Sequence, residues 1–286
     1  MEALAILVFL VWLGIPLITY AFYWYEHSTP SCLHPGAKSE REVIQKLVHR
    51  DLRVIAFSGL VSSIVALPIV VILYPFGFIS RWWSVRKNPS AGTIIFIHGL
   101  FHNPSAALLL KTVFSRRGYS FISLRYQPFK ETIFSVLEKL ERDVEKSLRD
   151  VPKDESVVLI GHSLGGILAG LLGRKLTEKG IPVKGVIAMG TPFKGSRLAI
   201  FARCSLGGSL RFGNPVLRDV RKLLESLPFP AVQIWSTADN MVFPISSLYE
   251  VPEGWDRVTM PPVCHTGMVF WPGLSGKISE IMGRWL

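Results

Sequence analysis

The chain has 286 residues, of which 49% are hydrophobic, and a formal net charge of +11 at pH 7. This length suffices for one full-sized α/β domain with additions. The basic residues are dispersed and form no stripe with aromatic residues, so we expect no nucleic-acid partner. The three cysteines give neither a disulfide framework nor a zinc-binding spacing, and we expect no metal and no organic cofactor.

Two long segments near the N-terminus, residues 3–25 and 54–80, contain no charged residue. Each exceeds the roughly 20 residues that a helix needs to cross the hydrocarbon core of a bilayer. A signal peptide and a buried core helix are the alternatives, but the first segment lacks the basic start of a signal peptide. Aromatic residues at the ends of both segments suit the membrane–water interface. We therefore expect a two-pass transmembrane hairpin within a membrane anchor formed by residues 1–88.

The basic residues also suggest which side of the membrane the domain occupies. Residues 1–80 carry five Lys or Arg and five Asp or Glu, so the net charge of +11 lies entirely in the rest of the chain. The five basic residues of the hairpin lie between the two spans: Lys38, Arg41, Lys46, Arg50 and Arg53. Three more follow the second span: Arg81, Arg86 and Lys87. The positive-inside rule places the hairpin loop in the cytoplasm and the large domain on the non-cytoplasmic, periplasmic side.

The rest of the chain, residues 89–286, alternates between short apolar runs and amphipathic segments. The runs that are typical of buried parallel strands are 93–97, 119–124, 156–160, 183–189, 231–236 and 257–260. The helical segments between the early runs are 105–114, 131–149 and 167–175. This alternation predicts an α/β fold with a mostly parallel sheet and helices on both faces.

The third run ends in a Gly-x-Ser-x-Gly sequence that surrounds Ser163. A sharp turn between strand and helix needs small residues on both sides, here Gly161 and Gly165, and presents the serine as a nucleophile above the sheet edge. The pattern alone also fits an ordinary Gly-rich turn, so its context decides. Ligands of such sheets bind beyond the carboxyl ends of the strands.

A tetrahedral oxyanion formed at Ser163 needs preorganised hydrogen-bond donors. The backbone N–H of Leu164, directly after the serine, is one candidate. The backbone N–H of Leu100, in the loop after the first strand, is the second, and Gly99 lets that loop approach. We interpret the side chain of His98 as a histidine that shapes the loop.

Three motifs occur in a fixed order along this region. They are His-Gly-Leu-Phe-His-Asn at 98–103, Gly-His-Ser-Leu-Gly-Gly at 161–166 and Gly-Thr-Pro-Phe-Lys-Gly-Ser at 190–196. Over residues 92–286 the chain resembles the α/β-hydrolase lipases and esterases, with the bacterial triacylglycerol lipases as the most similar group. The resemblance implies the α/β-hydrolase fold and a serine nucleophile. The two N-terminal spans are a departure from the secreted lipases.

The family's triad follows the chain order Ser, then Asp or Glu, then His. His265 is the one histidine after Ser163, and it lies in a Pro-rich loop where the family places its base. Asp239, just past the run 231–236, resembles the family's acid. A surface histidine and an Asx-turn aspartate are the alternatives, and Asp256 and Glu253 are the other candidates for the acid.

Residues 196–230 do not fit the strand–helix rhythm, and they mix apolar side chains with arginines. This is the usual position of a lid over an acyl pocket, and an ordinary pair of surface helices is the alternative.

These observations predict a membrane-anchored serine hydrolase that cleaves carboxylic esters, with lipid or acylglycerol esters favoured by the resemblance and the anchor. An acyltransferase or a thioesterase that uses the same triad is the first alternative. A catalytically inactive, hydrolase-like module that binds partners at the membrane is the second. The acyl-chain preference and the oligomeric state are not predicted.

Overall fold

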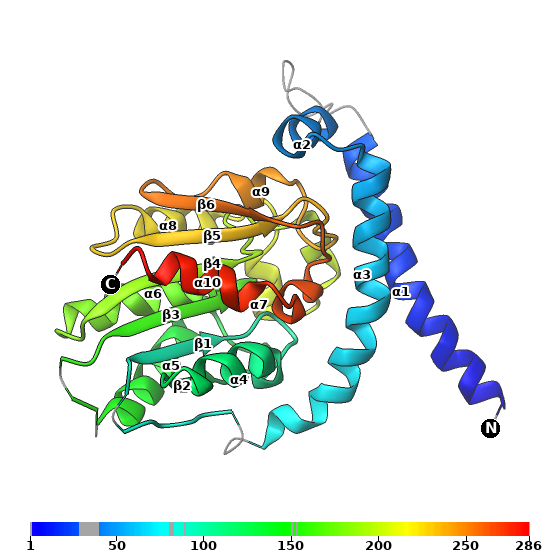
Figure 1. Cartoon of the computed structure of the whole chain (residues 1–286). Coiled ribbons are helices and arrows are strands. Elements are labelled where there is room, and N and C mark those ends of the chain that lie inside the picture. Colours follow the sequence, from blue (N-terminus) through cyan, green and yellow to red (C-terminus); the bar gives the residue numbers. More distant parts are fainter. Residues whose placement is uncertain are drawn as a thin grey trace.

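The computed structural model describes residues 2–28, 40–79, 83–88, 90–149, 151–152 and 154–285 (Figure 1). Lys38 and Arg81, two of the residues used to predict membrane sidedness, lie outside the described residues. The last predicted residue of the second span, Ser80, also lies outside them.

Six strands form one sheet in which all neighbours run parallel, in the order β2-β1-β3-β4-β5-β6. In chain order the strands are β1 (Thr93–Ile97), β2 (Ser120–Leu124), β3 (Val157–His162), β4 (Val183–Met189), β5 (Ala231–Ser236) and β6 (Trp255–Met260). Each predicted strand is present, with its ends shifted by at most two residues. The α/β prediction is confirmed, and the sheet is entirely parallel.

Helices cover both faces of the sheet, as Figure 1 shows. One face carries α5 (Ile133–Leu148), α6 (Leu164–Glu178) and α8 (Pro215–Leu224), and the other carries α4 (Leu108–Arg116) and α10 (Leu274–Met282). Alternate residues of β1 enter the two cores, because successive side chains of a strand point to opposite faces. Ile95 and Ile97 belong to the first core, and Ile94 and Phe96 to the second.

The shorter elements complete the edge at which the strands end. They are the 3₁₀ helices η3 (Pro104–Ala107), η4 (Arg197–Phe201) and η5 (Thr266–Phe270), and the short α-helices α7 (Ser205–Ser209) and α9 (Ser246–Tyr249). The predicted helix 105–114 thus begins as η3 and continues as α4. The predicted lid is also divided, into η4 with α7 and the separate helix α8.

The N-terminal region forms α1 (Glu2–Ser28), α2 (Glu40–Val48), α3 (Leu52–Leu73) and the 3₁₀ turn η1 (Tyr74–Phe78). Figure 1 shows α1 and α3 side by side at the edge of the sheet where the strands end. The indole N–H of Trp12 on α1 donates to the carbonyl of Ile64 on α3 at 2.8 Å. Among the described residues, one helical stretch is long and apolar enough to span a membrane, Leu52–Phe78. The first predicted span is helical but is not confirmed as a membrane span.

Candidate active site

The predicted nucleophile lies at a sharp turn between β3 and α6. Ser163 has φ +57° and ψ −124°, a left-handed conformation that non-glycine residues rarely adopt. Its backbone N–H donates to the carbonyl of Met189 at 2.8 Å, and its carbonyl accepts from the Thr191 hydroxyl at 3.0 Å. The turn is therefore held from the end of the neighbouring strand β4 and from the loop that follows it.

The glycines around this turn are required by close backbone contacts. A Cβ on Gly161 would lie 2.1 Å from the carbonyl oxygen of Gly165. A Cβ on Gly165 would lie 2.1 Å from the carbonyl oxygen of Ile97, at the end of β1. The strand, the helix and the loop after β1 thus pack against one another without side chains between them, which is the geometry expected of a nucleophile elbow.

The predicted base and acid are hydrogen-bonded to each other. The Nδ1 of His265 lies 2.6 Å from the Oδ2 of Asp239. The other carboxylate oxygen of Asp239 accepts from the backbone N–H groups of Met241 and Val242, at 2.9 and 3.0 Å. Asp239 is 2% exposed and His265 is 7% exposed, so the pair is shielded from solvent. Since the carboxylate occupies Nδ1, the Nε2 atom remains available to take a proton.

The other candidates for the acid do not reach this histidine. Asp256 lies on β6 and Glu253 precedes β6, and both are exposed. Of the acidic residues that were considered, the structure brings Asp239 to His265.

The predicted oxyanion donors lie on both sides of Ser163. Leu164 is the first residue of α6, where the N–H groups have no partner within the helix. Leu100 follows Gly99, whose Cβ position would lie 2.9 Å from the Cβ of Ser163. Within the described part of the chain, neither N–H donates a hydrogen bond to another backbone group. Both are therefore available to an oxyanion at the serine.

Ser163, His265 and Leu100 line one pocket of about 180 Å³. Its wall is mostly apolar and includes five residues of the predicted lid segment: Ser196, Leu198, Ala199, Ala202 and Leu210. The η4–α7 half of this segment therefore covers the pocket. The other half does not, since Leu217, Val220 and Leu224 of α8 pack into the core beside α6.

Two histidines that were not singled out from the sequence also line the pocket, His102 and His162. The Nε2–H of His162 donates to the backbone carbonyl of His265 at 3.0 Å and so links the elbow to the loop that carries His265. Burial lowers the pKa of His102 to about 4, lowers that of His162 well below its usual value, and lowers that of His98 to about 3. All three are neutral at pH 7 and add no charge beside His265. His98 does not line the pocket, and its ring stacks on Tyr126 at 4.4 Å, in keeping with a role in shaping the loop.

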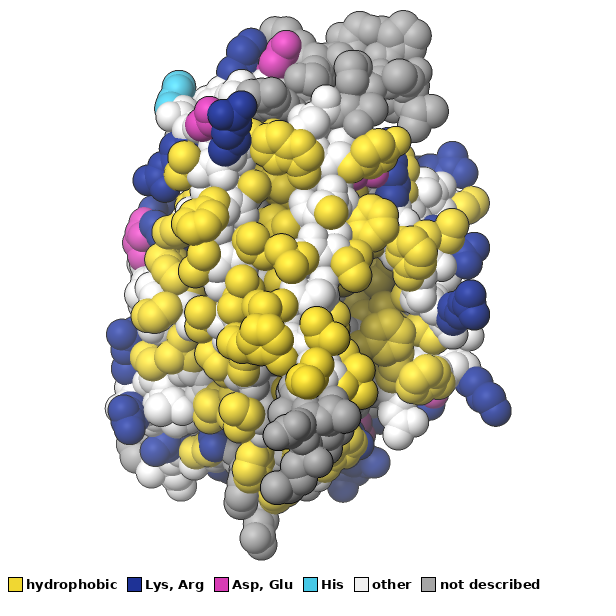
Figure 2. All heavy atoms as spheres, turned by 90° about the vertical axis from the view of Figure 1, so that its right-hand side faces the viewer, with side chains coloured by type: hydrophobic (Ala, Val, Ile, Leu, Met, Phe, Trp, Pro, Cys, Tyr) yellow, Lys and Arg dark blue, Asp and Glu magenta, His cyan; other side chains and the backbone are white. Residues whose placement is uncertain are grey.

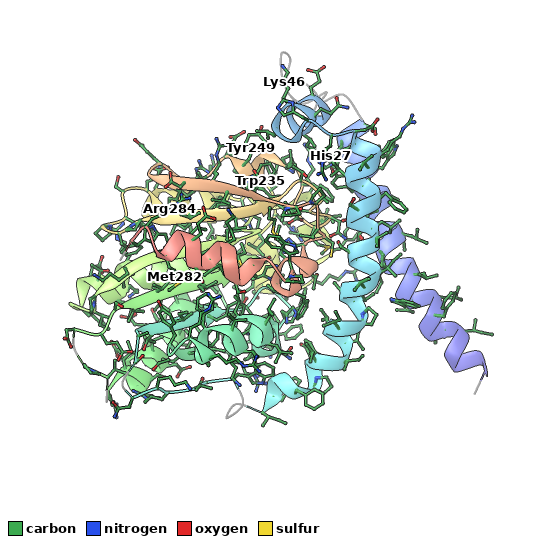
Figure 3. The ribbon with its side chains drawn as sticks, in the orientation of Figure 1. His27, Lys46, Trp235, Tyr249, Met282 and Arg284 are labelled. Carbon is green, nitrogen blue, oxygen red and sulfur yellow. The ribbon has the colours of Figure 1, made fainter. Side chains whose placement is uncertain are left out.

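The loop that carries Asp239 packs against helix α1. The hydroxyls of Tyr20 and Tyr23 donate to the carbonyls of Ala238 and Thr237, at 2.6 and 2.7 Å. Figure 3 labels His27, near the end of α1, in the upper half of the view, where Trp235 and Tyr249 of the domain also lie. Trp235 is 2% exposed and belongs to the apolar cluster that joins the N-terminal helices to the domain.

Asn240 connects α1 to the predicted base. Its Oδ1 accepts from the backbone N–H of His265 at 3.1 Å, and its Nδ2 donates to the Thr19 hydroxyl at 2.8 Å. From α3, the Ser62 hydroxyl accepts from the backbone N–H of Cys264 at 2.6 Å. The sequence offers one hint of this arrangement, an amide side chain directly after the acid, but nothing that pairs it with Thr19.

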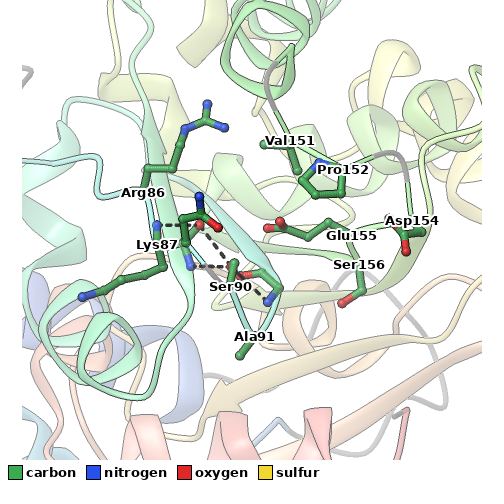
Figure 4. Close-up of a pocket in the computed structure, with 12 residues that line it drawn as sticks. Arg86, Lys87, Ser90, Ala91, Val151, Pro152, Asp154, Glu155 and Ser156 are labelled. Carbon is green, nitrogen blue, oxygen red and sulfur yellow. Dashed lines mark hydrogen bonds between the residues drawn. The ribbon is translucent and has the colours of Figure 1, made fainter.

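A larger cavity, of about 510 Å³, lies at the opposite edge of the sheet, where the strands begin (Figure 4). Arg86 and Lys87 lie on one side of it and Glu155 on the other. It contains none of the predicted site residues, so we place the site at the smaller pocket. Among the described residues, no group of three or more His, Cys, Asp and Glu side chains is arranged to hold a metal ion.

Comparison with known proteins agrees with this fold. A family model described as the alpha/beta hydrolase family matches residues 94–280. No curated protein sequence matches the chain. The mature lipase BlEst2 of Bacillus licheniformis superposes with a TM-score of 0.56 at 15% identity, over 69% of this chain and 94% of that one. The type II thioesterase YbtT of the yersiniabactin pathway superposes with a TM-score of 0.53 at 14% identity, over 71% and 96%.

Est1E from Butyrivibrio proteoclasticus gives a TM-score of 0.51 at 16% identity, over 68% of this chain and 88% of that one. At such identities the solved structures show a shared fold alone, since one fold hosts many activities. The family model, in contrast, covers well over half of the chain. The chain belongs to the alpha/beta hydrolase family.

Proposed function

We propose that this protein is a membrane-attached serine hydrolase that cleaves carboxylic esters. The observation that carries the proposal is the buried His265–Asp239 pair in the wall of the pocket that also contains Ser163 at a strained turn. A serine hydroxyl is a weak nucleophile until a base that is itself held by a carboxylate activates it. In this proposal, residues 89–286 form the catalytic domain and residues 1–88 form the anchor.

In the proposed reaction, the Ser163 oxygen attacks the ester carbonyl carbon while Nε2 of His265 takes the serine proton. The Asp239 carboxylate stabilises the imidazolium that forms, and the N–H groups of Leu100 and Leu164 stabilise the oxyanion. The intermediate expels the alcohol, which takes the proton from His265, and an acyl-enzyme remains. Water activated by His265 then releases the acid and regenerates the serine.

Lipid or acylglycerol esters are the proposed substrates. The apolar pocket wall suits an acyl chain, and the N-terminal helices suit attachment to a membrane where such esters are found. The two-pass arrangement predicted from the sequence, with the domain on the periplasmic side, is one form of attachment. The contacts between the helices and the domain favour a second form, in which the helices lie along the membrane surface.

Hydrolysis of p-nitrophenyl esters with acyl chains from two to sixteen carbons, by the detergent-solubilised full chain, tests the proposal. We expect activity that is lost in Ser163→Ala. Parallel assays with acyl-thioesters and with added alcohol acceptors distinguish the esterase from a thioesterase and an acyltransferase. Absence of turnover on every substrate by folded wild-type protein would favour the inactive interaction module.

A further inference from the structure

Helix α3 contacts the hydrolase domain along most of its length. Its buried residues Leu52, Ile55, Gly59 and Ala66 span 14 positions, about 21 Å at ~1.5 Å per residue. Beyond them, the Asn103 side chain in the loop after β1 donates to the carbonyl of Tyr74 at 2.8 Å. The domain therefore lies beside this helix and does not extend from one of its ends, as Figure 1 shows.

This contact is difficult to combine with a helix that crosses the bilayer. The hydrocarbon core is about 30 Å thick, so a crossing α3 would carry the domain into it for most of that depth. The loops around Asp239 and His265, which contact α1 and α3, would then lie among acyl chains. Irregular backbone and charged side chains are costly where they face lipid. The exposed side chain of Arg203, next in sequence to the pocket residue Ala202, would add to that cost.

The opposite side of the helix pair is strongly apolar. Figure 2 shows hydrophobic side chains covering α1 and α3 and continuing onto the adjoining domain, with Lys and Arg along both edges of this face. The large exposed hydrophobic residues of the two helices include Phe9, Leu10, Leu17, Ile18, Trp24, Phe57, Val65 and Ile72. Contiguous exposed patches of this kind mark sites of interaction with a membrane or a partner.

The pocket rim belongs to the same face. Ile200 and Phe201 of η4 are 60% and 68% exposed, and the ring of Phe201 lies 6.0 Å from that of Phe22 on α1. Arg197 of η4 forms an ion pair with Glu26 of α1, which fixes the two elements together. Met241, in the pocket wall, is 41% exposed. The apolar surface is thus continuous from the hairpin to the entrance of the pocket.

We propose that α1 and α3 lie along a single leaflet of an anionic membrane, on the same side as the catalytic domain, and do not cross it. In an ordinary interfacial helix, one face contacts water and the other enters the leaflet. Here the catalytic domain covers the first face of the helix pair, and the apolar face enters the leaflet. The basic edges, and the net charge of +11, attract anionic headgroups. If the proposed function holds, the ester substrate enters the pocket directly from that leaflet, past Ile200 and Phe201.

Sidedness tests this arrangement independently of catalysis. The background is the full-length protein with Cys32→Ser and Cys204→Ser, in which the buried Cys264 is retained. One variant adds Arg50→Cys, just before the second helix of the hairpin, and the other adds Lys184→Cys in the domain. Each variant is reconstituted into sealed vesicles of phosphatidylcholine and phosphatidylglycerol and labelled with a membrane-impermeant maleimide. In a third variant that carries both cysteines, we expect each molecule to be labelled at both positions or at neither before detergent is added, as intact mass measures. Molecules labelled at one position alone would show a crossing hairpin and overturn the proposal.

Depth provides the second measurement. An environment-sensitive NBD label at Ile200→Cys, in the same background, should be quenched by lipids that carry a doxyl group near the headgroup. The matched label at Lys184→Cys should not be quenched. Equal quenching at the two positions, or none at residue 200, would contradict the proposal. Failure of fluorophosphonate labelling at Ser163 would refute the proposed function but leave both of these results unchanged.

Discussion

The imidazole Nδ1 of His265 lies 2.6 Å from the carboxylate of Asp239, and both side chains are buried at the edge where the parallel strands end. Two backbone N–H groups hold the second carboxylate oxygen, so the acid cannot rotate away from the histidine. This pair sets the tautomer of the base.

Replacement of Asp239 by asparagine should therefore lower kcat by about 10³- to 10⁴-fold, because an amide leaves His265 in the wrong tautomer. KM should change little, since Asp239 does not line the pocket. Steady-state hydrolysis of a p-nitrophenyl ester measures both constants. Asp256→Asn, at an exposed position on β6, is the matched control and should behave as wild type. A comparable loss of kcat in the two variants would show that Asp239 is not the acid of the triad.

The bridge from Thr19 through Asn240 to the backbone of His265 predicts that a residue of α1 influences turnover. Thr19→Val removes the acceptor of the Asn240 amide with almost no change in shape, and leaves a buried donor unpaired. We expect kcat per labelled active site to fall by about three- to tenfold, which corresponds to the net free energy of one hydrogen bond. Thr19→Ser, which restores the hydroxyl, should recover it.

The control for this substitution is Ile18→Val on the same turn of α1, where the side chain is 59% exposed. A loss of the same size in Ile18→Val, or no loss in Thr19→Val, would show that the bridge does not position the histidine.

The contact between the two N-terminal helices and the acid loop should depend on Gly59. A Cβ at this position would lie 2.0 Å from the hydroxyl oxygen of Tyr20 and 2.8 Å from the Cβ of Ala238. Gly59→Ala must therefore displace the tyrosine from its hydrogen bond with Ala238, and we expect a destabilisation of about 1–3 kcal/mol. Thermal unfolding in detergent measures it. Gly14→Ala, where a Cβ meets open space, should be neutral or stabilising; equal behaviour of the two alanines would refute the contact.

Acid should destabilise the fold through His98. Burial lowers the pKa of this imidazole to about 3, whereas the unfolded chain has a value near 6.5. As the pH falls, the unfolded chain binds the His98 proton before the folded protein does. The contribution of neutral His98 to the free energy of unfolding is therefore complete above pH 6.5 and is lost as the pH falls from 6.5 towards 3. The loss from this group should reach about 2 kcal/mol at pH 5. Melting temperatures between pH 7.5 and 5 should fall less steeply in His98→Asn than in wild type, and parallel slopes would contradict the assignment.

The sheet and the elbow were predictable from sequence because their signals are local. Apolar β-branched runs mark the buried strands, and Gly161 and Gly165 mark the turn around Ser163. His265 was predictable from its order in the chain, and the structure places it next to Asp239 as expected. The structure brings these residues together, and their roles as nucleophile, acid and base remain predictions.

The rest depends on contacts between segments far apart in the chain. Thr19 and Asn240 are 221 residues apart, and no pattern around either residue indicates the other. The lid prediction failed to separate η4, which covers the pocket, from α8, whose apolar stripe packs into the core. Hydropathy gave the apolar character of α1 and α3 but not their orientation, because a helix that crosses a bilayer and one that lies along a domain can have the same composition.

The most direct test of the central claim is reaction of the folded full-length protein with a fluorophosphonate probe, followed by mass-spectrometric mapping of the modified residue. We expect stoichiometric modification of Ser163, none in Ser163→Ala, and a strongly reduced rate in His265→Ala. Stoichiometric modification that maps to Ser163 would show an activated nucleophile at the elbow. A folded wild-type protein that remains unmodified would contradict the assignment of this pocket as the active site of a serine hydrolase.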